Sequence, residues 1–468
     1  MRHLFRAWVA AGVFLVGTLA GPAPTKAAEP SKRLDVARTQ LPSGLRLVLS
    51  EQPAVPIVAI DCLVDGGARV DPADRPGLAA LTASLLEEGT AGRSAQDIAE
   101  IIDTLGGSFG SGSATDWVSV SALVRARDFE TGLDLVSRSL REPTFPEDAV
   151  ERRRTETLGS LKAAEDQPGY VASRTFDAAL FGNAPYGHPT QGTSASVEAI
   201  TRDEIETYHR RWIVPGRTIC AIVGDVPVER MKQAAEQKLG SWKAKDAPTE
   251  PSPAGPATAR TVLVDRQITQ ANIVVGHRGV DRKHPDFFAI RVLNHILGGG
   301  GFNSRLVDRV RDDNGMAYSV YSRFGSNRLP GSFEVVLQTG VENASEALGL
   351  VREEIEKMHD EGASGEELSS AQDYLTGNFP LALDSTTKLA GLLAQIEYFG
   401  LGDDYIDTYA DRIRAVSLED VRQAARKHLA PEDLIVVVVG PVDRLDEQGL
   451  SDKRPNGSRT AMDAPKIP

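Results

Sequence analysis

Two kinds of segment alternate along this chain: short apolar runs of strand length, and longer stretches in which apolar residues recur every three or four positions. The first kind indicates buried β-strands and the second amphipathic helices. In the first half, the pattern predicts strands at 45–50 and 57–66, helices at 76–88 and 94–105, a strand region at 109–124, a helical stretch at 128–212 and a strand at 217–224.

The second half of the chain repeats this order of elements. Its pattern predicts a strand at 270–278, helices at 285–297 and 302–313, strands at 317–324 and 331–339, a helical stretch at 344–428 and a strand at 433–440. The order of strands and helices is therefore the same on both sides of the chain's midpoint.

Two segments make the similarity explicit. Residues 200–226 align without a gap to residues 416–442, and each predicts a helix, a short turn, a buried strand and a closing glycine. Thr201 and Ser417 occupy the same place in the two segments, where a hydroxyl residue caps a helix N-terminus. A match of this length on both sides of the midpoint predicts an internal duplication.

A stretch rich in proline and alanine at 243–259 lacks any apolar period, which is typical of an exposed linker. We therefore predict an α+β fold with two homologous halves, each a mostly antiparallel sheet covered by helices. The predicted segments are an N-terminal domain at 35–242, the linker at 243–259, a C-terminal domain at 260–446 and a flexible tail at 447–468.

The start of the chain has the features of a secretory signal peptide. Arg2 and Arg6 precede an apolar run at 7–19, and small residues up to Ala28 offer a cleavage site. A permanent membrane anchor is the alternative, but the run is shorter than the roughly 20 residues that span a bilayer. We expect cleavage of residues 1–28 and a periplasmic or secreted protein without a stable membrane span.

The charge of the chain argues against one class of binding partner. The chain has 52 Lys and Arg against 65 Asp and Glu, a net charge of -13, and no basic stripe, so nucleic acid is a poor candidate partner.

The chain has two cysteines, Cys62 and Cys220, which lie in apolar strand-like runs. They can pair in an oxidising compartment or remain as two buried thiols, and two cysteines are too few ligands for a zinc site.

Residues 77–90, GLAALTASLLEEGT, resemble the string that carries the inverted zinc motif His-x-x-Glu-His in the pitrilysin/insulinase family. In that family the two histidines bind zinc and the glutamate activates a water molecule. Here the three motif positions fall on Ala80, Ala83 and Ser84, and the family's third ligand falls on or close to Ser160. The resemblance therefore implies a degenerate site, with no metal and no cofactor on this chain.

The second half keeps a different family string. Residues 297–320 resemble the family segment that carries an Arg and a Tyr seven positions apart, here Arg311 and Tyr318. The resemblance implies that this pair binds substrate, and the guanidinium fork and phenol hydroxyl are suited to hold a peptide carbonyl or carboxylate. The alternative is an arginine in an ordinary ion pair and a tyrosine in the core.

Four consecutive glycines, Gly298, Gly299, Gly300 and Gly301, precede that pair. A phosphate-binding loop would need a following Gly-Lys-Ser/Thr, which is absent, so a flexible turn between two helices is the simpler interpretation. Metal-free subunits of related processing peptidases carry a longer glycine-rich loop that handles substrate, and the resemblance extends to this chain only in the short form of that loop.

The resemblance implies a clamshell of two α+β halves in which substrate adds a strand to a sheet edge. Some family members divide the work between a chain with the zinc motif and a chain with the Arg/Tyr pair. This sequence fits the second type: a non-catalytic, substrate-binding subunit, inactive alone. Its expected partners are peptide substrate and a zinc-bearing homologous subunit, in a heterodimer or a dimer of heterodimers.

Three alternatives remain open. The protein can be a stand-alone periplasmic peptide-binding or assembly protein, a structural subunit of a membrane complex, or an active enzyme with unfamiliar ligands. Retention of Arg311 and Tyr318 favours a role with substrate over a purely structural role.

Overall fold

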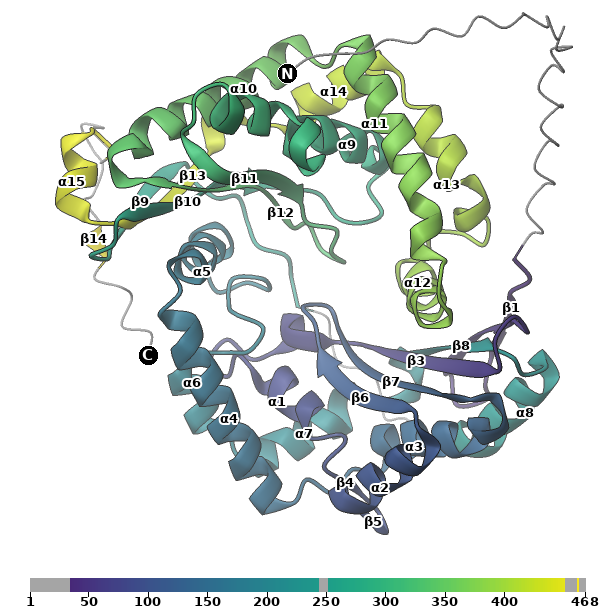
Figure 1. Cartoon of the computed structure of the whole chain (residues 1–468). Coiled ribbons are helices and arrows are strands. Elements are labelled where there is room, and N and C mark those ends of the chain that lie inside the picture. Colours follow the sequence, from purple (N-terminus) through teal and green to yellow (C-terminus); the bar gives the residue numbers. More distant parts are fainter. Residues whose placement is uncertain (1–33, 244–250, 451–460, 463–468) are drawn as a thin grey trace, which may run out of the picture. The chain divides into compact units, whose positions relative to one another are not determined.

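The computed structural model describes residues 34–243, 251–450 and 461–462 (Figure 1). The predicted signal peptide, most of the predicted tail and part of the predicted linker lie outside these residues. Contacts group the described residues from Asp35 onward into one compact unit. Within the described residues, none of the helices is both long and apolar enough to cross a membrane.

The first half begins with three strands and continues as a mixture of helices and strands. Its strands are β1 (Ala37–Gln40), β2 (Arg46–Glu51), β3 (Ile57–Asp65), β4 (Gly89–Thr90), β5 (Arg93–Ser94), β6 (Ser108–Ser113), β7 (Trp117–Arg125) and β8 (Thr218–Gly224). Its helices are α1 (Leu78–Ser84), α2 (Ala95–Leu105), α3 (Phe129–Arg141), α4 (Glu147–Glu165), α5 (Pro168–Phe181), α6 (Ser194–Ala199), α7 (Arg202–Trp212) and α8 (Val228–Leu239).

The second half has the same succession. Its strands are β9 (Arg260–Asp265), β10 (Gln270–Arg278), β11 (Ala317–Phe324), β12 (Ser332–Gly340), β13 (Ile435–Gly440) and β14 (Ala461–Met462). Its α-helices are α9 (Phe287–Asn294), α10 (Ala344–Glu361), α11 (Gly365–Asn378), α12 (Thr386–Phe399), α13 (Tyr405–Arg414), α14 (Leu418–His428) and α15 (Val442–Glu447), and its π-helices are η4 (His295–Gly299) and η6 (Val307–Asp312).

Apart from the outermost strands β1 and β14, the two large sheets have equivalent strand orders, which confirms the predicted pair of homologous α+β halves. The first sheet runs β1-β2-β8-β3-β7-β6 and the second β11-β12-β10-β13-β9-β14. In both, the last long strand of the half lies between the first two, parallel to one and antiparallel to the other. The remaining long neighbours pair antiparallel. The sequence pattern missed β9, a short strand that follows the proline-rich stretch.

Each half sends one helix to the sheet of the other half (Figure 1). Helix α5 of the first half packs on β10 and β13, and α12 of the second half packs on β3 and β8. Alternate residues of a strand point to opposite faces. In β13, Val436 and Val438 therefore join the core of the second half, whereas Val437 and Val439 join a separate cluster with Phe176 of α5. Burial on both faces explains the uninterrupted apolar run of this strand.

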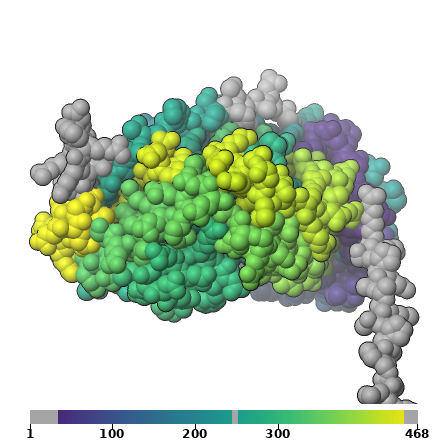
Figure 2. All heavy atoms as spheres, turned by 90° about the horizontal axis from the view of Figure 1, so that it is seen from above, coloured from purple at the N-terminus to yellow at the C-terminus, as the bar shows by residue number. Residues whose placement is uncertain are grey.

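The outer face of the second half is helical. Residues 344–428, green to yellow in Figure 2, make up most of the surface on that side. One edge of the second sheet is formed by β11, which pairs with β12. The predicted substrate-binding residues lie at this edge.

Cys62 and Cys220 form a disulfide between neighbouring strands. They are direct partners in the antiparallel pairing of β3 and β8, with Cα atoms 4.0 Å apart. Both side chains are fully buried in the core of the first half. The structure therefore selects the paired state from the two alternatives that the sequence left open.

Candidate substrate-binding site

The predicted substrate residue Tyr318 lies on an edge strand. Strand β11 pairs with β12, and the described residues provide no neighbour on its other side. The pairing register shifts between Ala317 and Ser319, so Tyr318 lies at a bulge, and 84% of its surface is exposed. An edge strand with an unpaired row of backbone groups is a template for an added strand.

Arg311 reaches this strand from η6, the π-helix just before it. Its guanidinium carbon lies 5.9 Å from the centre of the Tyr318 ring and 5.0 Å from that of Phe302. Its carboxylate contact is a loose one to Asp312, at 3.7 Å. The structure thus brings the predicted pair together, with the cation close to two aromatic rings at distances that suit cation–π attraction.

Phe302 is the member of this site that sequence reasoning missed. It follows the four glycines, and 72% of its surface is exposed. The available signal was a large apolar residue directly after four glycines, since large apolar residues are normally buried and glycine runs are not. We refer below to Phe302, Arg311 and Tyr318 as the aromatic–arginine site.

The four glycines before Phe302 do not share one kind of structure: Gly298 and Gly299 end the π-helix η4, and Gly300 and Gly301 follow it. A Cβ atom on Gly298 would lie 2.6 Å from the backbone nitrogen of Ser322 on β11, and one on Gly300 would lie 2.6 Å from the carbonyl oxygen of His295. Only Gly301 of the four adopts a positive φ, 62°. The turn expected over four glycines is therefore shorter, because two of them are helical, and Gly298 lets the backbone approach β11 closely.

The positions of the family zinc motif lie on α1 and offer no metal ligand. Ala83 is fully buried, Ala80 is half-buried, and the Ser84 hydroxyl donates to the carbonyl oxygen of Leu81 at 2.9 Å. Ser160, the position of the family's third ligand, is exposed on α4. Methyl groups and a hydroxyl engaged with its own helix do not fit a zinc ion, which requires imidazole, thiolate or carboxylate donors.

Ion pairs join α4 to the segment that follows α1. Arg153 contacts Glu88 at 2.7 Å and Glu87 at 3.1 Å, and Arg152 also pairs with Glu88. The pKa of Glu87 is raised, because the effect of burial exceeds the opposing effect of the Arg153 charge. The two segments that carry zinc ligands in the family are thus held together here by charged side chains.

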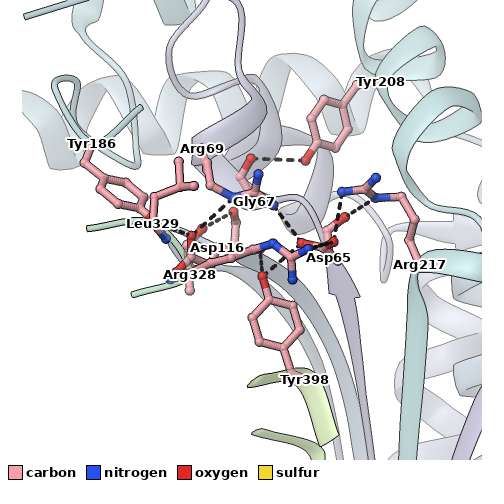
Figure 3. Close-up of polar contacts among 12 residues, drawn as sticks. Asp65, Gly67, Arg69, Asp116, Tyr186, Tyr208, Arg217, Arg328, Leu329 and Tyr398 are labelled. Carbon is pink, nitrogen blue, oxygen red and sulfur yellow. Dashed lines mark hydrogen bonds and ion pairs between the residues drawn. The ribbon is translucent and has the colours of Figure 1, made fainter. Parts of the chain in front are cut away.

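A buried polar network connects the two halves (Figure 3). Asp65 accepts hydrogen bonds from Arg69 at 2.7 Å and Arg217 at 2.9 Å, both in the first half. It also accepts one from the Tyr398 hydroxyl of α12, at 2.9 Å. A buried carboxylate of this kind is stable only with such partners, so Asp65 depends on a residue from the other half.

The loop between β11 and β12 enters the same network. The backbone N–H of Arg328 donates to Asp116 at 2.8 Å, and that of Leu329 donates to the Tyr186 hydroxyl at 2.9 Å (Figure 3). Tyr186 in turn donates to Asp116 at 2.7 Å. The far end of the edge strand is therefore fixed to the first half, while its near end carries the aromatic–arginine site.

A cavity of about 290 Å³ borders this network, lined by residues of both halves. Glu334 is nearly fully buried there and pairs with Arg323 at 2.9 Å. Asp177 also lines the cavity, and no hydrogen bond or ion pair from the described residues reaches its carboxyl group. Burial, with the charge of Glu334, raises the pKa of Asp177 to about 8.

Comparison with known protein families gives matches over both halves. Residues 46–194 match the profile of insulinase (peptidase family M16), and residues 199–375 match the profile of the peptidase M16 inactive domain.

Related sequences cover almost the whole chain. An uncharacterized zinc protease of Streptomyces coelicolor is 30% identical over 424 residues, which is 89% of this chain and 92% of that protein. A non-peptidase homolog of Helicobacter pylori is 23% identical over 84% of this chain and 91% of its own length.

Solved structures share this fold over most of the chain. A peptidase M16 inactive domain from Pseudomonas fluorescens superposes with a TM-score of 0.83 and 28% identity, covering 87% of this chain and 98% of that one. A protease from Helicobacter pylori gives a TM-score of 0.80 at 19% identity, covering 87% and 100%, and shows the fold alone. The inactive-domain and non-peptidase matches support the coarse prediction of a non-catalytic member of this group.

Proposed function

The chain belongs to the insulinase family of peptidases, family M16, and on that premise we propose that it is the substrate-binding subunit of a heterodimeric zinc peptidase. In this proposal a homologous partner carries the zinc ion and the general base. The present chain binds peptide or an unfolded segment and presents it to that partner. Residues 1–28 would direct export of the subunit to the periplasm or outside the cell and would then be cleaved.

One observation carries the proposal: Arg311 lies beside the exposed rings of Phe302 and Tyr318 at the bulge of an unpaired edge strand. Exposed aromatic residues and arginine are enriched where proteins bind peptides and other proteins. The arrangement also has no evident structural task, because Tyr318 is largely outside the core and Arg311 has only a loose ion pair.

The geometry suggests how a peptide would be bound. An extended peptide can add to the free edge of β11, where main-chain hydrogen bonds supply affinity without regard to sequence. The guanidinium of Arg311 offers several fixed donors for a peptide carbonyl or carboxylate, and the Tyr318 hydroxyl can add a directional hydrogen bond. The contribution to turnover is one of positioning, since a fixed peptide reacts more readily.

The first test is whether the chain needs a partner. We expect the purified mature chain to cleave no peptide and to hold no stoichiometric zinc at the family motif positions, because Ala80, Ala83 and Ser84 offer no ligands. Affinity capture from the native host should recover a homologue with an intact His-x-x-Glu-His motif, and the pair should cleave an unstructured fluorogenic peptide. Cleavage by the chain alone would refute the proposal.

The second test separates Arg311 from its neighbours. In the reconstituted pair, Arg311→Ala should lower kcat/KM for the peptide by roughly 10- to 100-fold, the effect of losing a charged hydrogen bond of about 1.5–3 kcal/mol. Arg309→Ala is the matched control, since Arg309 lies on the same π-helix and pairs with Glu353 at the surface. Equal turnover in both variants and the parent would remove the assigned role. Capture of peptides without any zinc-bearing homologue would favour a stand-alone peptide-binding protein.

A further inference from the structure

Three potential metal ligands meet in the second half, far from the degenerate motif. His284 and Asp286 lie in the segment that leads into α9, and His428 is the last residue of α14. One ligand atom from each of the three lies within 4.8 Å of the other two, and this is the only such group of three among the residues that the structure describes.

The distances fit a single small ion. Asp286 Oδ2 lies 2.7 Å from His428 Nε2 and 3.8 Å from His284 Nδ1. Ligands of a tetrahedral zinc ion, bound at about 2.0–2.1 Å, lie about 3.3 Å from one another. These two separations lie on either side of that value and the third is below 4.8 Å, so side-chain rotations would bring the three donors to a shared centre.

The surroundings give an ion access from solvent. The side chains of His284, Asp286 and His428 are 23%, 32% and 8% exposed, so the group opens to solvent on one side and is anchored on the other. The two imidazole rings are nearly perpendicular, with centres 4.7 Å apart, so they approach the carboxylate from different directions. Asp420 adds negative charge near Asp286.

Three contacts must change when an ion binds. His428 Nε2 and Asp286 Oδ2, which form a direct hydrogen bond at 2.7 Å, would separate so that both face the ion. Lys427 Nζ lies 2.8 Å from Asp286 Oδ2, where its charge would repel a cation. Its side chain is 60% exposed and can move into solvent. The backbone N–H of Asp286 donates to His284 Nδ1 at 3.1 Å, and that hydrogen bond would be exchanged for the metal. Lys427 therefore competes with a cation for the Asp286 carboxylate.

We propose that His284, Asp286 and His428 form a binding site for a divalent transition-metal ion of the zinc type. Two imidazole nitrogens and one carboxylate oxygen are the donors that zinc, cobalt and nickel accept, whereas magnesium and calcium prefer oxygen ligands alone. A bound ion would join the start of α9 to the end of α14, two helices that pack together. This role is structural and does not depend on the proposed peptidase partnership.

Sequence spacing could not reveal the site. Asp286 and His428 are 142 residues apart, and none of the chain's histidine pairs has the four-residue spacing of a helical zinc motif. The fold brings the three residues together by packing α14 against α9.

The test is metal binding by the intact mature chain without a polyhistidine tag. Isothermal titration with Zn²⁺ at pH 7.5 should give one equivalent, and Co²⁺ should give the visible ligand-field absorption of a nitrogen- and oxygen-bound ion. Zn²⁺ should raise the Tm, because it binds only the folded state, and Mg²⁺ should not. Absence of saturable Zn²⁺ binding would overturn the proposal.

Variants make the assignment specific. His428→Gln and His284→Gln should each weaken Zn²⁺ binding by at least about tenfold, whereas Lys427→Gln should strengthen it by removing the competing charge. His359→Gln is the control, since His359 pairs with Asp360 at the surface of α10. If His428→Gln unfolds, the partly exposed His284 and Lys427 variants still decide the matter. Equal affinity in the parent, His284→Gln and Lys427→Gln would place the bound zinc elsewhere and refute the site.

Discussion

At the scale of single residues, the cavity between the two halves changes the protonation of the Asp177 carboxyl group. Its carboxyl group faces the cavity without an ion-pair partner among the described residues, and the nearby guanidinium of Arg323 is already bound to Glu334. Burial and the charge of Glu334 raise its pKa from 3.8 to about 8. At neutral pH this aspartate is therefore held mainly in its protonated, uncharged form.

The raised pKa predicts a pH dependence of stability. Between pH 4 and 8 the folded chain retains a proton that the unfolded chain has lost, so this group's contribution to the free energy of unfolding falls as pH rises, by at most about 1.4 kcal/mol per pH unit. Asp177→Asn should remove that slope and make the protein more stable than the parent at pH 8. Urea denaturation at several pH values measures both effects, with exposed Asp373→Asn as the control. Identical slopes in all three proteins would contradict the assignment.

The predictability of the site also differs residue by residue. Arg311 and Tyr318 were predicted because their string and spacing survive in the sequence, and the structure brings them together. Phe302 was missed because exposure of an apolar side chain cannot be read from its identity. The cluster of His284, Asp286 and His428 was also missed, because residues from separate elements meet only after folding.

At the scale of elements, the disulfide staples the two central strands of the first sheet. Cys62 and Cys220 are cross-strand partners that lie 158 residues apart in sequence. A crosslink restricts the unfolded chain more when the closed loop is longer, and the chain-entropy model gives about 5 kcal/mol for a loop of this length. Most of the first half lies inside that loop.

The disulfide leads to a prediction about stability in reducing conditions. The Cys62→Ala/Cys220→Ala double variant should lose about 2–5 kcal/mol of unfolding free energy, because its unfolded state regains conformational freedom. Guanidinium denaturation of the parent and the double variant measures the difference. The reduced parent should behave like the variant, and thiol titration of the denatured parent should find no free thiol before reduction. Unchanged denaturation midpoints would contradict the expectation.

Most elements could be predicted from periodicity, but their boundaries and partners could not. The predicted helices at 285–297 and 302–313 contain the π-helices η4 and η6, which apolar periodicity does not distinguish from α-helix. Helices α5 and α12 were expected, but their apolar positions do not predict which sheet each helix packs on. That choice depends on contacts between residues more than 100 positions apart, which local patterns do not encode.

At the scale of the whole molecule, the exchange of α5 and α12 makes each half incomplete by itself. Without the second half, Phe176 and Leu180 of α5 lose the sheet on which they pack, and without α12, the first sheet loses the cover of one face. Asp65 would also lose its hydrogen bond from Tyr398. The linker joins two parts that are already held together by buried apolar surface.

Separate expression of the halves tests this dependence. We expect residues 35–242 and 260–446 to be poorly soluble or partly folded alone, and to form a one-to-one complex when they are co-expressed. Size-exclusion chromatography and circular dichroism of each half and of the mixture measure the outcome. If either half alone were monomeric and unfolded with the cooperativity and midpoint of the whole chain, the exchanged helices would not be needed for its stability.

The exchange of helices also fixes an order in time. Roughly 175 residues separate the end of β8 at Gly224 from the end of α12 at Phe399. At about 5–20 residues per second, synthesis of that stretch takes roughly 10–35 s. During this interval the first sheet can assemble while the face that carries Ile219 and Val223 waits for its helix. A chain that stalls in this window presents an open apolar sheet, the kind of surface on which nascent proteins aggregate.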